Sequence, residues 1–467
     1  MFRKEETICA PATSGAGAIA VIRISGSQSL KICQKIFFPF EKKNKLAESK
    51  GFIILYGEIR DNDELVDEVL VSIFRAPHSY TGEDSVEISC HASRYIQSRI
   101  LELLIRNGAS IAAPGEFTQR AFLNGKMDLS QAEAVADLVA SSSEASHRIA
   151  INQMRGGFSA EINKLRSELL RFASLIELEL DFGEEDVEFA DRKELRSIAV
   201  KVKELADRLA SSFRFGNVIK NGIPVTITGK PNSGKSTLLN ALLNEERAIV
   251  SEIPGTTRDV IEDTIIINGL EFRFIDTAGL RDTSDEIERL GIQKTNEKIV
   301  KASVVLLVDD ISGTPASINR LADQIRKKID GQSKSLVIII NKTDLASASK
   351  LTELRKTIRM SGDESLLFIS AKERKGLDEL RMKLSVIVIK EKFSLHDVII
   401  TNIRHYEALS QVSESLGRVV SGLDESIPDD LIAIDIRQAI HYLGEITGEI
   451  TTDEILGNIF KNFCIGK

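Results

Sequence analysis

The chain has 467 residues, of which 42% are hydrophobic and 28% charged, a globular composition in a length that suits two to four domains. Its 61 basic and 69 acidic residues give a formal net charge of −8, which argues against a protein that coats nucleic acid non-specifically, while a local patch could still bind a structured RNA. Four cysteines without C-x-x-C spacing, and no apolar run of about 18 residues, favour a reduced, cytoplasmic protein without a zinc site, disulfide framework or membrane span.

Residues 1–124 are predicted to form a mixed strand and helix module. Strands are expected at Ala18–Ile24, Phe52–Ile59, Leu65–Phe74 and Val86–Cys90, followed by a helix at Tyr95–Ile105. Two charges, Arg23 and Glu87, interrupt otherwise apolar strands. A charged residue in such a strand usually points to solvent, because alternate residues of a strand face opposite sides of the sheet. The residues alone favour this interpretation for Arg23 and Glu87.

The rest of the chain changes character twice. Residues 125–221 carry apolar side chains at helical spacing, and this pattern resumes in residues 390–467, with helices expected at Asp397–Leu416 and Asp429–Leu443. Residues 222–389 instead alternate strand and helix, which indicates a doubly wound, mainly parallel sheet. We therefore expect an α/β cassette inserted into a helical domain and preceded by an α+β N-terminal domain.

The segment Gly229–Ser236 fits G-x-x-x-x-G-K-[ST] and lies between an expected strand, Ile223–Thr228, and an expected helix, Ser236–Leu243. Its glycines allow the backbone to approach phosphate, and amides at a helix N-terminus bind anions. Lys235 can reach the terminal phosphates, and the Ser236 hydroxyl can ligate Mg²⁺.

Four further motifs follow in the order that a GTPase requires. Gly255–Asp259 offers Thr257 as a second Mg²⁺ ligand, and Asp276–Gly279 can hold the ion's water shell and sense the γ-phosphate. Asp344, in Asn341-Lys342-Thr343-Asp344, can accept two hydrogen bonds from guanine, which adenine cannot donate on that edge. Ser370-Ala371-Lys372 can contact the guanine carbonyl through its backbone. Together the motifs predict GTP binding.

Two positions depart from the pattern of small GTPases. Leu280 stands where many of them have a glutamine that orients the attacking water, so another residue must do this, and Arg281–Leu290 contains acidic candidates. No arginine finger is evident. The side-chain carbonyl of Asn232 could help to hold a monovalent cation in its place, or it could satisfy its own turn, and the residues alone favour neither interpretation.

Over its whole length the chain resembles the MnmE (TrmE) family, GTPases that modify the wobble uridine of certain tRNAs. The resemblance is carried by the stretches Ile22–Gly26, Ser79–Asp84, Pro114–Thr118, Arg120–Lys126, Gln131–Ala134, Gly229–Ser236, Gly255–Asp259, Asp276–Arg281 and Phe463–Lys467. One departure is Ala92-Ser93, where the family usually has two glycines after Cys90-His91.

The resemblance implies a folate-binding and dimerisation domain (1–124), a helical domain in two parts (125–221 and 390–467) and a GTPase domain (222–389). It implies a homodimer that forms a heterotetramer with an FAD-dependent partner of the MnmG family. The pair would add a carboxymethylaminomethyl or aminomethyl group to carbon 5 of the wobble uridine in the tRNA substrate. The one-carbon unit would come from 5-formyl- or 5,10-methylene-tetrahydrofolate, with GTP hydrolysis stimulated by K⁺ and by dimerisation of the GTPase domains.

The resemblance also implies the site residues. The catalytic set is Glu288 as the water-orienting acid, with Lys235 and Asn232; Mg²⁺ falls on Ser236 and Thr257, and K⁺ on Asn232, Ser251, Ile253 and Thr256. Folate contacts fall on Arg23, Glu87, Lys126 and Lys467. The GTP-binding residues are Asn232, Ser233, Gly234, Lys235, Ser236, Thr237, Ser251, Glu252, Ile253, Pro254, Gly255, Thr256, Thr257, Asp276, Thr277, Ala278, Gly279, Asn341, Lys342, Asp344, Ser370, Ala371 and Lys372.

Two questions stay open. Cys464 could act as a nucleophile or pack as a small apolar side chain, and it is left out of the catalytic set. The rival function is a GTP-dependent assembly switch, for example in ribosome maturation, because related cassettes serve both uses. The N-terminal residues Arg23, Glu87 and Lys126, together with Lys467, are the features that favour the modification enzyme.

Overall fold

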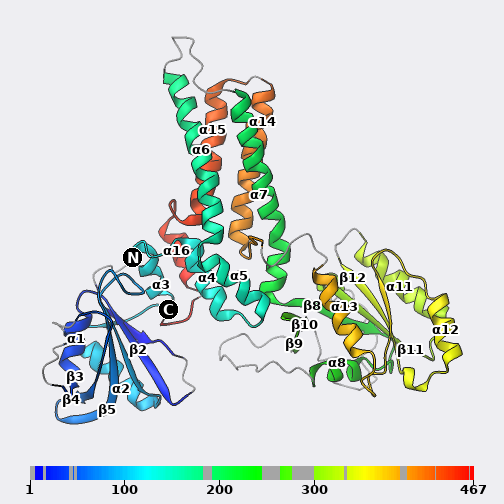
Figure 1. Ribbon diagram of the computed structural model, residues 1–467, viewed down its shortest axis with the longest axis horizontal. Helices are drawn as coiled ribbons and strands as arrows, with labels where there is room; N and C mark the ends of the chain where they lie inside the picture. Colours follow the sequence, from blue (N-terminus) through cyan, green and yellow to red (C-terminus); the bar gives the residue numbers. More distant parts are fainter. Residues whose placement is uncertain are drawn as a thin grey trace. The chain divides into compact units, whose positions relative to one another are not determined.

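The computed structural model describes residues 6–13, 17–41, 46, 50–181, 192–244, 263–275, 299–330, 334–389, 397–425, 427–461 and 463–466 (Figure 1). The chain divides into two compact units. Unit 1 comprises Met1–Val139, Ile151–Asp207 and Glu407–Lys467, and unit 2 comprises Ala140–Ala150 and Arg208–Tyr406. The four domain ranges expected from the sequence stay a prediction.

Unit 1 begins with a seven-stranded sheet in the order β3-β4-β5-β6-β2-β1-β7, antiparallel except where β1 pairs with β7. The helices α1 (Ser29–Ile36) and α2 (Arg94–Arg106) pack against it. The strands are β1 (Ile8–Pro11), β2 (Ile19–Ser25), β3 (Phe37–Pro39), β4 (Ile53–Asp61), β5 (Glu64–Phe74), β6 (Ser85–His91) and β7 (Ser110–Ile111). All four strands predicted in this region are confirmed.

The two faces of this sheet differ. On β2, Ala20, Ile22 and Ile24 point into the core shared with α1 and α2. On the opposite face large apolar side chains stay exposed, among them Ile54 at 66% on β4 and Leu70 at 46% on β5. Antiparallel sheets commonly have one solvated face that is polar, whereas on this face exposed apolar side chains lie among polar ones such as Glu58, Glu68 and Glu87.

Helices from both sides of the predicted insertion pack together in unit 1. The helix α6 (Gly157–Asp181) lies along α15 (Asp429–Thr447) (Figure 1). Arg196 on α7 (Arg192–Asn221) pairs with Asp424 on α14 (Ile403–Asp424), with Nε 2.7 Å from Oδ1. This confirms the helical domain predicted around an inserted cassette. The other helices of this region are α3 (Glu116–Leu123) and α16 (Asp453–Phe460), while α4 (Leu129–Ala140), α5 (Glu144–Met154), α7 and α14 contribute residues to both units.

Unit 2 holds a six-stranded sheet in the order β13-β12-β11-β8-β10-β9, parallel except where β9 pairs with β10. Alternate residues of β11 enter two separate cores: Val304, Leu306 and Val308 face α8 and α13, whereas Val305 and Leu307 face α11 and α12. The predicted doubly wound sheet is therefore confirmed. The elements are β8 (Ile223–Gly229), α8 (Lys235–Leu243), β9 (Asp263–Ile267), β10 (Leu270–Phe274), β11 (Val304–Asp310), α11 (Pro315–Ile329), β12 (Ser335–Asn341), α12 (Ala348–Thr357), β13 (Ser365–Phe368) and α13 (Leu377–Ile389).

One predicted boundary is wrong. The helix expected at Asp397–Leu416 begins only at Ile403. The side chain of Asn402 accepts a hydrogen bond from the Arg404 amide at 3.0 Å, which caps the helix start. Before the helix, the Ile400 amide donates a hydrogen bond to the Ser212 hydroxyl of α7 at 3.1 Å. This bond holds the residues around Ile400 against α7, so they do not extend the helix.

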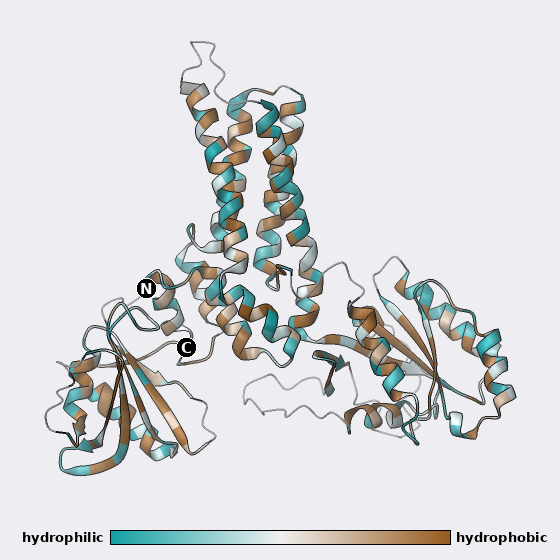
Figure 2. Cartoon of the chain, viewed as in Figure 1, coloured by the Kyte–Doolittle hydropathy of each residue, from teal (hydrophilic) through white to brown (hydrophobic). Residues whose placement is uncertain are grey.

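Most helices are amphipathic, with apolar and polar residues on opposite faces (Figure 2). Such helices bury one stripe against a core and leave the other in water. Across the described part of the chain, no helix combines the length and the apolar character needed to cross a membrane.

Candidate nucleotide site and candidate N-terminal ligand site

The candidate nucleotide residues gather at one edge of the unit 2 sheet. The strands β8, β11, β12 and β13 are parallel neighbours, so the loops that follow their carboxyl ends lie side by side. Ligands of open α/β sheets bind at this edge. The predicted phosphate loop follows β8, Asn341–Asp344 begins at the end of β12, and Ser370–Lys372 comes just after β13.

The phosphate loop depends on two glycines. Gly229 has φ of +145°, and a Cβ there would lie 1.9 Å from the Val308 carbonyl oxygen. Gly234 has φ of +90°, and its Cβ would lie 2.2 Å from Asn341 Nδ2. A side chain at Gly229 would collide with the backbone of β11, and one at Gly234 would displace the Asn341 side chain and strain a left-handed backbone.

The helix α8 begins at Lys235, immediately after the loop. Lys235 Nζ donates to the carbonyl oxygens of Gly229 at 3.2 Å and Lys230 at 2.6 Å, so its ammonium group is held against the loop that carries it. Ser236 and Thr237 occupy the first turn, where backbone amides favour an anion. The geometry fits a phosphate cradle with Ser236 beside it.

Asn341 joins the phosphate loop to the predicted base-binding loop. Its Nδ2 donates to the Ser233 carbonyl oxygen at 3.0 Å, and its Oδ1 accepts from the Ala371 amide at 3.0 Å. Both hydrogen bonds are buried, so both backbone groups rely on this one side chain. The three loops are therefore brought together as the motifs predicted.

Asp344 and Ser370 also meet. The Ser370 hydroxyl donates to Asp344 Oδ1 at 2.5 Å, and this hydrogen bond lowers the pKa of Asp344 from its usual value. The carboxylate is therefore ionised at neutral pH, as it must be to accept hydrogen bonds from a guanine ring. The Ser370 oxygen also accepts from the Glu373 amide at 3.2 Å, which fixes the hydroxyl in place.

Two acidic residues at the end of β11 were missed by the sequence reasoning. Asp309 Oδ2 lies 2.9 Å from Lys230 Nζ, and Asp310 Oδ2 lies 2.8 Å from Lys342 Nζ. Burial raises the pKa of Asp310, but hydrogen bonds from Lys342 and Ser312 lower it by more, so this carboxyl is ionised. The available signal was their position directly after an apolar strand, at the edge where the GTPase motifs lie.

Several predicted site residues lie outside the described residues. These are Ser251, Glu252, Ile253, Pro254, Gly255, Thr256, Thr257, Asp276, Thr277, Ala278, Gly279, Glu288 and Lys467. Within the described ranges, no group of three or more His, Cys, Asp or Glu side chains is arranged to hold a metal ion.

In unit 1, the two charges predicted in apolar strands meet. Arg23 on β2 lies directly opposite Glu87 on β6, and Arg23 Nε and Nη2 each lie 2.8 Å from Glu87 Oε1. The Arg23 guanidinium carbon lies 5.2 Å from the ring centroid of Tyr80 and 5.6 Å from that of Phe117. The pair is thus half-buried in aromatic surroundings, unlike ordinary solvent-facing charges.

The C-terminal segment reaches the same place. Arg23 Nη1 donates to the Gly466 carbonyl oxygen at 3.5 Å, and the Gly115 amide donates to the Cys464 carbonyl oxygen at 3.4 Å. Gly466 has φ of +95°, and a Cβ there would lie 2.0 Å from the Pro11 carbonyl oxygen. The residue before Lys467 is therefore seated on β1 beside the Arg23–Glu87 pair.

Lys126, another predicted folate contact, is held by other residues of unit 1. Its Nζ donates to the Pro77 carbonyl oxygen at 2.9 Å, and its side chain packs where Gly82 leaves room. The intervening loop is fixed by a buried network, in which the hydroxyls of Ser25 and Thr81 are 2.7 Å apart and Arg120 pairs with Glu83.

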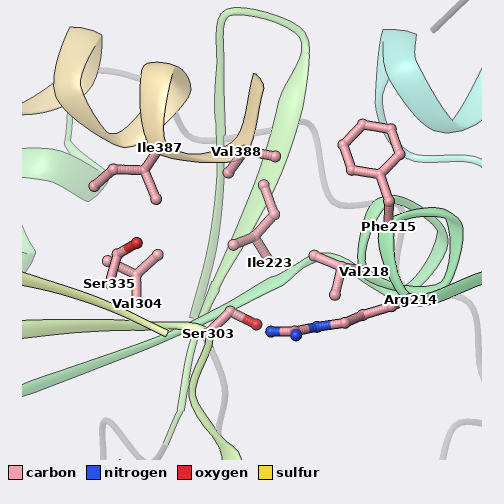
Figure 3. Close-up of a pocket in the computed structure, with 9 residues that line it drawn as sticks. All are labelled: Arg214, Phe215, Val218, Ile223, Ser303, Val304, Ser335, Ile387 and Val388. Carbon is pink, nitrogen blue, oxygen red and sulfur yellow. The ribbon is translucent and has the colours of Figure 1, made fainter. Parts of the chain in front are cut away.

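A small cavity of ≈ 50 Å³ lies in unit 2 away from the predicted nucleotide residues. Its apolar lining includes Phe215, Val218 and Val388, while Arg214 extends toward Ser303 (Figure 3). Ile223, Val304 and Ser335, which also line it, open their strands at the amino edge of the sheet, opposite the GTPase motifs. This cavity is not part of the candidate nucleotide site.

Comparisons with known proteins agree with the resemblance. Residues 7–126 match the family described as the GTP-binding protein TrmE N-terminus, and residues 129–464 match the MnmE helical domain. The relatives named tRNA modification GTPase MnmE include those of Bacteroides thetaiotaomicron, 53% identical over 465 residues, and Flavobacterium johnsoniae, 52% identical over 468 residues. The alignments cover 99% and 100% of this chain, respectively, and 100% of each relative. The chain therefore belongs to the MnmE family of tRNA modification GTPases.

Proposed function

We propose that this protein hydrolyses GTP as a component of a tRNA-modifying complex in the cytoplasm. The tRNA would receive a carboxymethylaminomethyl or aminomethyl group on carbon 5 of its wobble uridine. The main support for GTP binding is the pair of hydrogen bonds made by the Asn341 side chain, which join the phosphate loop to the Ser370–Lys372 loop. Full-length similarity to relatives named tRNA modification GTPase MnmE supports the tRNA substrate.

In this proposal the nucleotide lies across the carboxyl edge of β8, β11, β12 and β13. The amides of Ser233–Thr237 and Lys235 bind the phosphates, while Asp344 accepts hydrogen bonds from guanine and Ala371 lies beside its carbonyl. The ionised state of Asp344 and the proximity of Ser370 support the assignment of the base. Together with Asn232, Asn341, Lys342 and Lys372, these residues are the described members of the predicted GTP-binding set.

Metal ions and Glu288 would supply the hydrolytic step. Ser236, in the first turn of α8, and Thr257 would hold Mg²⁺, which neutralises charge developing on the phosphates. Asn232, with Ser251, Ile253 and Thr256, would hold K⁺ in place of an arginine finger. Glu288 would orient the attacking water, since Leu280 has no polar group to do so.

Replacing K⁺ with Na⁺ at constant ionic strength should depress the GTPase rate. Equal rates in the two salts would remove the cation from the proposal. In parallel, Glu288→Ala should slow hydrolysis with little loss of GTP affinity. An unchanged rate in that variant would transfer the water-orienting role to another residue.

For the one-carbon chemistry, we propose that Arg23, Glu87, Lys126 and Lys467 bind a tetrahydrofolate derivative. The half-buried Arg23–Glu87 pair beside Tyr80 and Phe117 supports this, because paired polar groups among aromatic rings suit a flat, polar-edged ring. Gly466 lies beside Arg23 and packs against β1. This position supports a contribution of the next residue, Lys467, to folate binding.

We also propose a homodimer that works with an FAD-dependent partner of the MnmG family. The exposed apolar side chains on one face of the unit 1 sheet, among them Ile54, Tyr56 and Leu70, support contact with a second copy of the chain. Light scattering that gave the mass of a single chain would contradict the homodimer.

Nucleoside analysis of tRNA from cells that lack this chain tests the whole proposal. Loss of the modified wobble uridine, restored by the wild-type chain, is the expected result. Intact modification together with defective ribosomal particles would instead support the rival function, a GTP-dependent assembly switch.

A further inference from the structure

Lys342 joins three segments of the candidate nucleotide site. Its Nζ donates to the Asn232 carbonyl oxygen at 2.6 Å and lies 2.8 Å from Asp310 Oδ2. Asn232 and Lys342 both adopt left-handed backbone conformations, with φ of +60° and +63°. Such conformations are costly for residues other than glycine and persist only where surrounding contacts hold them.

Asp310 is held more firmly than the lysine it contacts. It is the last residue of β11 and is paired in register with Asn341 of β12, so its backbone belongs to the sheet. Its Oδ1 accepts hydrogen bonds from both the amide and the hydroxyl of Ser312, the former at 2.9 Å. Asp310 can therefore act as a fixed anchor for a flexible lysine side chain.

We propose that Asp310 is a positioning residue that sets the conformation of Asn232 through Lys342. The carboxylate restricts the lysine ammonium group to one place, and the ammonium group in turn holds the Asn232 carbonyl oxygen. Fixing this peptide orients the Asn232 side chain, which is the proposed K⁺ ligand, and the adjoining amides of the phosphate cradle. The effect on K⁺ binding rests on the proposed function, whereas the effect on the amides that would bind phosphate does not.

The neighbouring Asp309 has a parallel but separate contact. It pairs with Lys230, whose Nζ also donates to the Ser317 hydroxyl at 2.7 Å. Lys230 stands at the start of the phosphate loop, two residues before Asn232. The two adjacent carboxylates therefore hold different points of the loop, and only Asp310 acts on Asn232 through the motif Asn341–Asp344.

The test is a double-mutant cycle with Asp310→Asn, Lys342→Ala and the double variant, measured in the full-length protein. Two quantities are determined: the K⁺ concentration that gives half-maximal GTPase activity, and the Kd for fluorescent mant-GDP. The matched control is Asp323→Asn, since Asp323 pairs with Arg326 at 2.6 Å, on α11, and not with a residue of the loop. Melting temperatures establish that each variant is folded.

Asp310→Asn should raise both quantities by up to about fivefold, the range of a partly exposed ion pair, while Asp323→Asn leaves both unchanged. In the Lys342→Ala background, Asp310→Asn should have no further effect, because the side chain that links Asp310 to Asn232 is no longer present. A folded Asp310→Asn variant with wild-type values, or one whose effect persists without Lys342, overturns the inference. If the wild-type rate is independent of K⁺, the proposed cation site is wrong and the mant-GDP cycle alone decides the role of Asp310.

Discussion

Asn341 Nδ2 donates to the Ser233 carbonyl oxygen at 3.0 Å, so a residue of the predicted guanine motif holds the phosphate loop directly. The same side chain accepts the Ala371 amide through Oδ1. Its amide group thus sets the spacing between the part of the site that would bind phosphate and the part that would bind the base. Since the bridge is buried, water cannot replace it at low cost.

We expect Asn341→Ala to weaken GDP binding about tenfold or more. The substitution leaves one buried carbonyl and one buried amide without partners, at about 1–3 kcal/mol for each group. Titration with mant-GDP measures the loss. The matched control is Asn319→Ala, because Asn319 also bridges two backbone groups, the Thr357 carbonyl at 3.1 Å and the Arg359 amide at 2.9 Å, away from the predicted motifs.

The control should lower thermal stability while leaving GDP affinity unchanged. If both variants lost affinity equally, the effect of Asn341 would reflect general destabilisation of unit 2 and not its bridge.

The sequence could name the candidate nucleotide residues because the GTPase motifs are set by the chemistry of GTP. A guanine-binding carboxylate after one strand and a phosphate loop after another keep their spacing whatever surrounds them. The meeting of Arg23 with Glu87 could not be predicted in the same way, since it depends on how β2 pairs with β6 across 64 residues of chain. Likewise, the position of Asp310 after an apolar run does not reveal its partner, because the contact with Lys342 depends on the pairing of β11 with β12.

A second prediction concerns Gly216, near the C-terminal end of α7. A Cβ at this position would lie 2.1 Å from the Ile400 carbonyl oxygen and 2.7 Å from Ile399 Cγ2, so α7 passes directly against that segment. We expect Gly216→Ala to destabilise the protein by about 1–3 kcal/mol, the usual cost of overpacking. Thermal unfolding followed by circular dichroism measures the change.

Gly457→Ala is the control, because Gly457 also lies in a helix but a Cβ there would meet no atom of the described residues within 4 Å. Here alanine should stabilise by about 0.5–1 kcal/mol through its helix propensity. If both substitutions raised the melting temperature, the close approach of α7 to Ile399 and Ile400 would be refuted.

A third prediction concerns the four thiols, all of which lie in the described residues. Burial raises the pKa of Cys9 and Cys33 to about 12, and burial together with the Asp67 carboxylate raises that of Cys90 to about 11. Because the thiolate is the reactive form, these three thiols should resist iodoacetamide at pH values near 8. Cys464 is exposed and should be alkylated.

Mass spectrometry of the native protein should therefore find one alkyl group, and four after denaturation. Cys464→Ser should abolish native labelling altogether. Rapid native labelling of Cys9 or Cys33 would show that the core of the N-terminal sheet opens, contrary to the burial of both thiols.

The last prediction concerns the Arg23–Glu87 pair. Arg23 binds Glu87 through two nitrogens of its planar guanidinium group while the same group lies over Tyr80 and Phe117. Lysine would keep the positive charge, but it has neither the two adjacent N–H donors nor the planar group that lies over the aromatic rings. We therefore expect Arg23→Lys to weaken binding of 5-formyltetrahydrofolate about tenfold, as measured by titration calorimetry.

Arg60→Lys provides the matched control, since Arg60 also pairs with a glutamate, Glu58, on the same sheet, with Nε 2.6 Å from Oε2. That variant should bind the folate as the wild type does, and both variants should retain GDP affinity because their substitutions lie in unit 1. A wild-type protein that binds no folate would remove the one-carbon step from the proposed function. If the wild type binds and Arg23→Lys binds equally well, the folate site lies elsewhere and the Arg23–Glu87 pair serves only to join β2 to β6.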